Sequence, residues 1–271
     1  MKKSRVLTAL TIAATAVVLA ACGSTAKKTT TVTIGASPTP HAEILKHIQP
    51  ELKKEGVNLK IKQFQDYVLP NKALASKDID ANYFQHTPFL KEWNAKNKGN
   101  LISAGSIHLE PIAVYSKKYK TLKDLPKNAT VLVSNNVADY GRVLEIFKDA
   151  GLITLKKGTD TTNANFKDIA TNKKNIKFKT GYEPKLMPQL YNNKQGDAEV
   201  INSNYAVQAK LSPAKDAIAV EKSSSPYSNI VAIRPDEKNN KALKKVIKAL
   251  KSKSTQSWIK KHFKGSVEPV E

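Results

Sequence analysis

The sequence predicts an α/β fold in two lobes, and three observations lead to this prediction. A strand, a helix and another strand follow one another between residues 32 and 64, with the spacing of a βαβ unit. A second series of strands and helices begins near Leu122. Two helical segments close the chain after residue 239. We therefore expect two α/β lobes, with the chain crossing between them more than once.

The first lobe is expected to begin with a parallel, doubly wound sheet. Residues 32–36 predict a strand, residues 41–55 a helix with Ile44, Leu45, Ile48 and Leu52 on one face, and residues 58–64 a second strand. Further along, we expect a helix over 69–77, a strand over 80–84, a helix over 88–96, and strands over 101–106 and 112–116. Strands joined through a helix usually run parallel, which is the reason for expecting a parallel sheet.

The second series of elements supplies the rest of the fold. Expected strands cover residues 130–134, 176–180, 198–201, 217–220 and 229–233, and expected helices cover residues 140–150, 240–250 and 255–262. Ligands of such folds bind beyond the carboxyl ends of strands, often between lobes. Polar and aromatic residues at strand ends are therefore the candidates for a site.

The first 21 residues have the three zones of an export signal. Lys2, Lys3 and Arg5 give a positive start, and residues 6–18 form an apolar stretch shorter than the roughly 20 residues of a membrane-spanning helix. Small residues then lead to Cys22, which is the only cysteine and so cannot form an internal disulfide. Residues 1–21 are predicted to be a signal peptide.

The Leu-Ala-Ala-Cys run that ends at Cys22 resembles the bacterial lipobox, in which the cysteine is acylated and becomes the new N-terminus. A signal peptide cut near an alanine is the simpler alternative. Residues 22–31 are small and polar and predict a lipidated, flexible tether. We expect a fatty-acylated lipoprotein, anchored to the cell membrane on its extracytoplasmic face and folded from near Val32.

The composition describes a strongly basic protein. Residues 1–21 hold three basic and no acidic residues, so the remainder has 42 basic and 23 acidic residues and a net charge of about +19. Such a charge could suit nucleic acid, but the lysines are scattered and no basic–aromatic motif appears. We expect a solvated lysine surface, no nucleic-acid partner and a monomer.

Arginine is scarce in this chain. Beyond the signal peptide, Arg142 and Arg234 stand against forty lysines. Only the planar fork of arginine grips a carboxylate with two parallel bonds. Asp139 is the expected N-cap of a helix that begins at residue 140, which places Arg142 in the first turn, where a cation is mildly unfavourable. Binding of an anion and pairing with Asp139 or a glutamate both remain open for Arg142.

Aromatic residues stand where expected strands end. Tyr67 follows one strand, Phe84 and His86 end another on the same side by the period of two, and Phe89 lies just beyond. A core tyrosine and a structural histidine are the common alternatives.

Two amides occupy similar positions. Asn202 follows one expected strand and Asn229 begins another. Such amides often cap helices or turns. They can also hold an amino acid's ammonium and carboxylate groups, because each offers a donor and an acceptor.

Five motifs together resemble the NlpA family of methionine-binding lipoproteins. They are Gln65 to Asn71, Asp78 to His86, Gly141-Arg142, Ile201-Asn202 with Tyr205-Ala206, and Ser225 to Asn229. The resemblance runs from about Val32 to the C-terminus. It implies a two-lobed periplasmic-binding-protein fold of type 2-like form, with the ligand in the interlobe cleft. Lobe 1 is expected to comprise residues 32–112 and 230–271, and lobe 2 residues 113–229.

The resemblance also implies a site and partners. Residues Tyr67, Phe84, His86 and Phe89 would line a side-chain pocket, Arg142 would take the ligand carboxylate, and Asn202 and Asn229 would complete the polar grip. L-methionine, or a closely related amino acid or short peptide, would pass to an ABC permease and its ATPase, and no cofactor is implied. The chain departs from the family at Asp139, which is commonly asparagine, and at Phe89, which is often tyrosine.

Three other functions compete with this one. A metal-binding lipoprotein of a metal importer could use His41, His47, His86 and His108, although the spacing of six between the first two does not suit one helix face. An exported enzyme is disfavoured, because no Gly-x-Ser-x-Gly or His-Glu-x-x-His motif appears. A surface adhesin has only the net charge in its favour.

Overall fold

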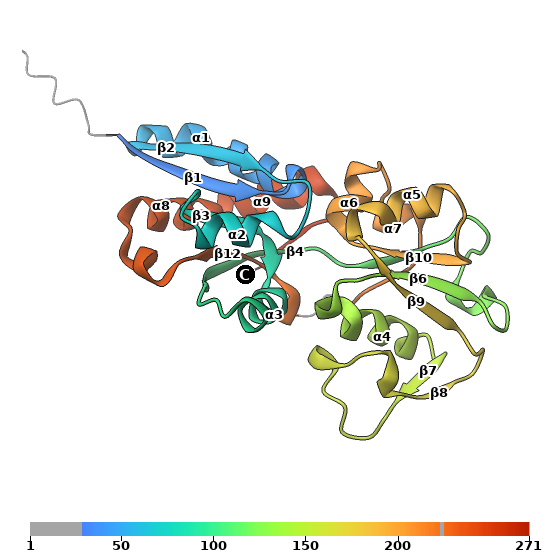
Figure 1. The fold of residues 1–271 in the computed structure, drawn as a ribbon. Coiled ribbons are helices and arrows are strands. Elements are labelled where there is room, and N and C mark those ends of the chain that lie inside the picture. Colours follow the sequence, from blue (N-terminus) through green and yellow to red (C-terminus); the bar gives the residue numbers. More distant parts are fainter. Residues whose placement is uncertain (1–28, 223–224, 271) are drawn as a thin grey trace, which may run out of the picture.

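The computed structural model describes residues 29–222 and 225–270, and Cys22 with the predicted signal peptide lies outside them. Figure 1 shows two α/β lobes side by side, each built around its own sheet. The chain leaves the first sheet after β4 (Ile102–Leu109) and returns to it at β12 (Asn229–Ile233). The predicted two-lobed α/β fold is confirmed.

The sheet of the first lobe has the strand order β13-β4-β12-β3-β1-β2. Its other strands are β1 (Thr30–Ala36), β2 (Val57–Gln63), β3 (Ala81–His86) and β13 (Glu268–Pro269). β1 pairs in parallel with β2 and β3, as expected, whereas β12 pairs antiparallel with β3 and β4. The prediction of a parallel sheet is therefore wrong for the part of the sheet that contains β12. This strand enters from the second lobe and runs opposite to β3 and β4.

The sheet of the second lobe has the order β11-β5-β10-β6-β9. Its strands are β5 (Ala113–Tyr115), β6 (Thr130–Ser134), β9 (Lys177–Tyr182), β10 (Ala198–Ile201) and β11 (Ala217–Val220). β6 pairs in parallel with β9 and β10, and β5 pairs antiparallel with β10 and β11. The exact lobe boundaries at 112/113 and 229/230 remain a prediction.

The longer helices lie where the sequence predicts them. They are α1 (Glu43–Lys54), α2 (Leu69–Ala75), α3 (Thr87–Asn97), α4 (Tyr140–Asp149), α8 (Lys241–Leu250) and α9 (Lys253–Phe263). The short helices α5 (Met187–Asn192), α6 (Ser203–Gln208) and α7 (Pro213–Asp216), and the paired strands β7 (Ile153–Leu155) and β8 (Ile169–Asn172), were not expected. Elements this short span too few turns or alternations to give a clear periodic pattern.

Each lobe has its own apolar core. In the first lobe, the predicted face of α1 is buried together with residues of α8 and α9, and these helices cover the sheet (Figure 1). In the second lobe, Val131 of β6 packs with Val143 and Phe147 of α4. Within the described residues, no helix is long and apolar enough to cross a membrane.

Several strands end where the two lobes meet. His86 ends β3, Ser134 ends β6 and Ile201 ends β10, while Asn229 begins β12. Because β12 runs antiparallel to β3 and β4, Asn229 pairs with both His86 and His108 in one row across the first sheet. This arrangement brings side chains that are far apart in the sequence to the junction of the lobes.

Candidate functional site

One cavity between the lobes is lined by every residue of the predicted site. These residues are Tyr67, Phe84, His86, Phe89, Arg142, Asn202 and Asn229. A second cavity of about 360 Å³ adjoins it and shares Tyr67 and Phe89. The geometry thus brings the predicted residues together, and the role of each in binding remains a prediction.

An aromatic cluster lines one side of the cavity. The ring centroids of Tyr67, Phe84 and Phe89 lie 5.7–6.0 Å apart in tilted or edge-to-face orientations. Tyr205 of α6 adds a fourth ring, 5.2 Å from Tyr67. These distances are typical of favourable aromatic pairs, so the cluster presents a firm apolar wall.

His86 joins the aromatic wall to the polar end of the cavity. It is the last residue of β3 and caps α3, where its Nδ1 accepts a hydrogen bond from the backbone N–H of Phe89 at 3.2 Å. The proton of a neutral ring therefore resides on Nε2, which lies 3.0 Å from Asp139 Oδ1 and donates to it. His86 is thus held by a bond to each lobe.

Asp139 is the N-cap residue of α4, as predicted, but it does not act as a side-chain cap. Its backbone is helical and its side chain makes no capping bond. The buried carboxylate instead accepts from His86 and Arg142 at Oδ1, and from Asn136 and Asn202 at Oδ2, at 2.6–3.3 Å. Burial alone would raise the pKa of Asp139, but the hydrogen bond and charge of His86, with Arg142 and Asn202, hold it well below its usual range.

Arg142 is the third residue of α4, as predicted, and is buried. Its Nε and Nη2 edge faces Glu221, with Nε 3.0 Å from both carboxylate oxygens. Nη2 also donates to the backbone oxygen of Glu110 at 2.8 Å, and Nη1 donates to Asp139. The two-bond grip expected for a ligand carboxylate is thus made with Glu221, so the alternative that Arg142 pairs with Asp139 or a glutamate is confirmed, although the sequence did not show which glutamate.

Gly141 allows the start of α4 to approach a neighbouring loop. A side-chain carbon at this position would lie 1.7 Å from the backbone oxygen of Thr161. Any larger residue would push away the helix turn that carries Arg142. This close approach explains why a glycine precedes the arginine.

The two predicted amides bond to other residues of the site. Asn202 follows β10 and donates to Asp139 at 2.8 Å, while its Oδ1 is buried without a donor among the described residues. Asn229 Oδ1 lies 2.9 Å from His41 Nε2. Asn202 and Asn229 thus approach the cavity from different lobes.

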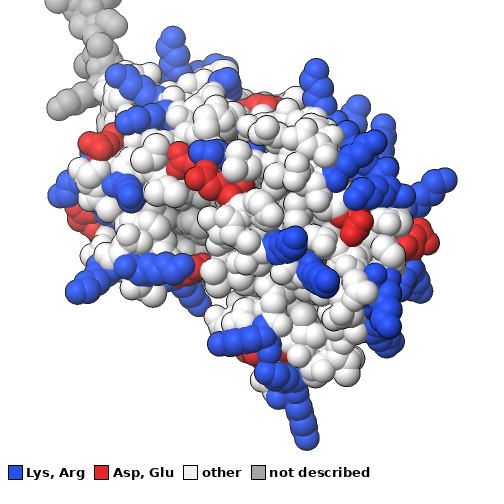
Figure 2. Space-filling model, turned by 45° about the vertical axis from the view of Figure 1, so that its right-hand side comes forward, with Lys and Arg blue, Asp and Glu red and all other residues white. Residues whose placement is uncertain are grey.

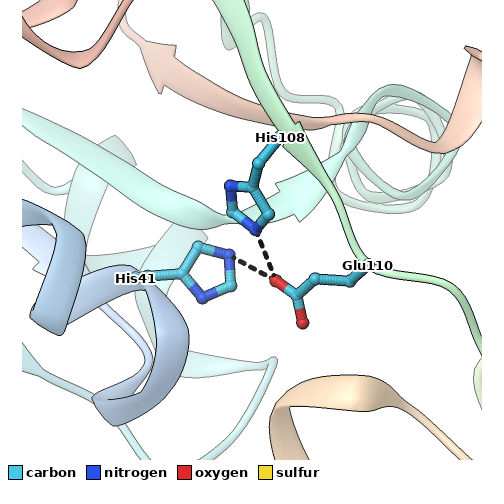
Figure 3. Close-up of side chains that lie close together, drawn as sticks. All are labelled: His41, His108 and Glu110. Carbon is cyan, nitrogen blue, oxygen red and sulfur yellow. Dashed lines mark hydrogen bonds and ion pairs between the residues drawn. The ribbon is translucent and has the colours of Figure 1, made fainter. Parts of the chain in front are cut away.

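His41 and His108, which the sequence offers as possible metal ligands, form a buried group with Glu110, which the sequence did not indicate (Figure 3). His108 Nε2 lies 2.8 Å and His41 Nε2 3.1 Å from Glu110 Oε1, and Glu110 lines the cavity. Within the described ranges, these three residues are the only group placed to hold a metal ion. The period of two between His108 and Glu110 at the end of β4 was the available signal. His47 instead stacks on Trp258, away from this group.

Burial keeps both histidines of this group neutral at physiological pH. Burial lowers the pKa of His41 to about 4, against the opposing effect of Glu110, and lowers that of His108 to about 3. Burial also raises the pKa of Glu110, although His41, Arg142 and His86 oppose the shift. Three buried carboxylates thus lie in this region: Glu110 lines the cavity, and Asp139 and Glu221 pair with Arg142.

Comparison with known proteins identifies the family. The model of the NlpA lipoprotein family matches residues 32–271. The chain belongs to this family. The methionine-binding lipoprotein MetQ of Bacillus subtilis is 48% identical over 260 residues, which are 93% of this chain and 94% of that protein.

Solved structures of family relatives share the fold. A pheromone cOB1 precursor/lipoprotein of the YaeC family from Enterococcus faecalis is 54% identical, with a TM-score of 0.87 over 89% of this chain and 100% of that one. A nutrient-binding protein from Burkholderia cenocepacia bound to methionine is 41% identical, with a TM-score of 0.82 over 89% and 100%. The periplasmic-binding-protein fold predicted for the chain is therefore confirmed, and the chain is a substrate-binding lipoprotein.

Proposed function

We propose that this lipoprotein binds L-methionine, or a closely related amino acid, between its lobes and delivers it to an ABC permease and its ATPase. The observation that carries the proposal is the convergence of the seven predicted residues on one cavity. The methionine-bound relative from Burkholderia cenocepacia supports the choice of ligand. The protein would bind its ligand without transforming it.

The aromatic wall suits a thioether side chain. Tyr67, Phe84 and Phe89 offer ring edges and faces within one cluster. A sulfur atom about 5 Å from a ring gains roughly 0.3–1.5 kcal/mol per contact. The adjoining cavity leaves room beyond the rings for the end of the side chain.

The polar end of the cavity suits an α-carboxylate. His86, Asn202 and Arg142 all carry donors that converge there, and each of them now donates to Asp139. A ligand carboxylate would share these donors or displace Asp139 from them. A charge-assisted hydrogen bond of this kind contributes about 1.5–3 kcal/mol.

Ligand binding would couple to the relative position of the lobes. Tyr67 donates to Asn204 Oδ1 at 2.6 Å, and Tyr205 donates to the backbone oxygen of Gln65 at 3.1 Å, so hydrogen bonds already cross the junction. Closure over a ligand would give the permease a distinct shape to recognise. The lipid at Cys22 would hold the protein on the extracytoplasmic face of the membrane, beside the importer.

The proposal is tested by mass spectrometry of the small molecule that co-purifies with residues 23–271, followed by calorimetry. We expect methionine, with weaker binding of norleucine because it lacks the sulfur. Metal analysis of the same sample addresses the alternative of a metal importer. A stoichiometric metal without any bound amino acid, and no heat with methionine after ligand removal, would refute the proposal.

A further inference from the structure

Glu110 is a buried carboxylate that faces the ligand cavity. It follows β4 directly, and its exposed fraction is 7%. It lines the same cavity as Arg142 and Asn229. None of the site motifs in the sequence contains it.

The carboxylate is fixed in place by groups from three segments. Oε1 accepts from Nε2 of His108 and lies 3.1 Å from Nε2 of His41. The backbone N–H of Asn204 also donates to the carboxylate. Tyr83 bonds through its hydroxyl to His108 Nδ1, which fixes the ring and leaves the proton on Nε2. Figure 3 shows the second carboxylate oxygen pointing away from both rings.

No cationic side chain among the described residues is bonded to this carboxylate. Arg142 donates to the backbone oxygen of Glu110, whereas its ion pairs are with the carboxylates of Glu221 and Asp139. Burying a carboxylate without a cation is costly, and hydrogen bonds from neutral groups offset only part of that cost. A carboxylate also has about four acceptor positions; His108 and the Asn204 N–H occupy two of them, and His41 Nε2 lies near a third. A cationic group in the cavity would complete the site.

We propose that Glu110, held by His41 and His108, receives the α-ammonium group of the ligand. This inference rests on the proposed function, because the ligand is taken to be an amino acid. The site would therefore require a free α-amine, and would reject N-acylated amino acids and their α-hydroxy analogues. His41 and His108 are positioning residues, since they act through Glu110.

His41 also connects the ammonium subsite to Asn229. Its Nε2 lies 3.1 Å from Glu110 Oε1 and 2.9 Å from Asn229 Oδ1. An ammonium group has three donors, and Glu110 and Asn229 are both acceptors at the cavity wall. The orphan Oδ1 of Asn202 is a further buried acceptor on the facing lobe. These oxygens form an acceptor set that matches a primary ammonium better than a neutral amide N–H.

The test compares wild type, Glu110→Gln and Glu199→Gln by calorimetry with three ligands. Glu199 is the matched control, because it is a buried glutamate that accepts from the Gly196 N–H outside the cavity. The ligands are L-methionine, its α-hydroxy analogue and N-acetyl-L-methionine. Wild type and Glu199→Gln should prefer methionine over the α-hydroxy analogue by about 30-fold or more, as expected when one partner of a buried charge pair is lost. Glu110→Gln should reduce that preference to a few fold.

Two results would overturn the inference while leaving the proposed function intact. One is wild-type protein that binds methionine and its α-hydroxy analogue equally well, a result that needs no variant to fold. The other is a stoichiometric Zn²⁺ site that Glu110→Gln abolishes without changing methionine binding, because Glu110 would then be a metal ligand. Wild-type protein that binds no methionine would instead count against the proposed function itself.

Discussion

Asp139 occupies donors that the proposed ligand carboxylate would need. It accepts hydrogen bonds from His86, Asn136, Asn202 and Arg142, which together form a receptor for an anion. The carboxylate of the chain thus lies where a ligand carboxylate would compete for the same donors. An asparagine here could not compete as an anion, so this position should tune selectivity between free acids and amides.

We predict that Asp139→Asn shifts preference toward ligands with a free carboxylate. Like charges placed side by side cost several kcal/mol, so the ratio of affinities for methionine over methionine amide should rise by about tenfold or more. Calorimetry with both ligands measures this ratio. Asp149→Asn is the control, because Asp149 lies at the other end of α4 and pairs with Lys222. An unchanged ratio in a folded Asp139→Asn protein would mean that the ligand carboxylate binds elsewhere.

A second residue-scale prediction concerns the aromatic wall. Phe84 is buried in β3, and its ring lies 6.0 Å from that of Tyr67 and 5.7 Å from that of Phe89. Phe84→Ala should weaken methionine binding by about 1–3 kcal/mol, as for truncation of a buried anchor. Phe166→Ala, in the core of the second lobe, should leave affinity unchanged. If Phe84→Ala binds methionine like wild type, Phe84 is a core residue only.

At the scale of elements, the pairing of Asn229 in β12 with His86 in β3 and His108 in β4 explains how the candidate site is assembled. β12 enters between β3 and β4, and places Asn229 beside the ends of both strands. Hydrophobic periodicity predicted β12 to the residue. It could not predict the pairing of β12 with β3, because this depends on contacts between residues more than a hundred positions apart.

The same limit explains which residues of the candidate site could be predicted from the sequence. Residues inside recognisable motifs or at strand ends, such as Tyr67 and Asn202, could be predicted. Glu110 and Glu221 could not, since their importance comes from partners in distant segments: His41 for one and Arg142 for the other. Asp139 lies at the predicted N-cap position, but its side-chain partners could not be predicted, because His86 and Asn202 donate to it from distant segments.

The buried histidines give an element-scale prediction about pH. His41 has a pKa of about 4 in the folded protein, whereas a solvent-exposed histidine has a pKa of 6.5. Between pH 6.5 and 4 the unfolded chain binds a proton that the folded chain does not, so stability falls as pH falls through this window. The slope is up to about 1.4 kcal/mol per pH unit for one such group. The raised pKa of Glu110 has the opposite effect on stability, because the folded chain takes up this proton at a higher pH than the unfolded chain does.

Urea unfolding at about pH 7 and about pH 5, on either side of the histidine's ordinary pKa, measures the effect. His41→Gln should lose less stability on acidification than wild type, since it removes one of the groups that resist protonation. His47→Gln provides a control at an exposed histidine of α1. Equal losses in wild type and His41→Gln would show that His41 does not govern the acid sensitivity of the fold.

At the scale of the whole molecule, the basic charge is a property of the surface. Figure 2 shows lysine and arginine side chains spread around both lobes on the visible face, without a single basic groove. Arg142, in contrast, is buried and bonded to two carboxylates. The net charge is thus a property of the solvated surface, which suits an anionic envelope, and under the proposed function ligand selectivity would come from a few buried groups.

The last prediction concerns attachment to the membrane. Within the described residues no helix can span a bilayer, and the lipobox-like run places the expected anchor at Cys22. Cys22→Ala should move the protein from the membrane fraction to the soluble fraction, because two acyl chains suffice for stable anchoring and the polar tether has little affinity of its own. Fractionation after a high-salt wash is required, since the lysine surface alone could retain protein on anionic lipids. Ser24→Ala, in the same tether, should stay in the membrane fraction. Methionine binding should be equal in both variants, because both positions precede the predicted lobes in the sequence. Cys22→Ala protein that remains with salt-washed membranes would remove the main support for a lipid anchor.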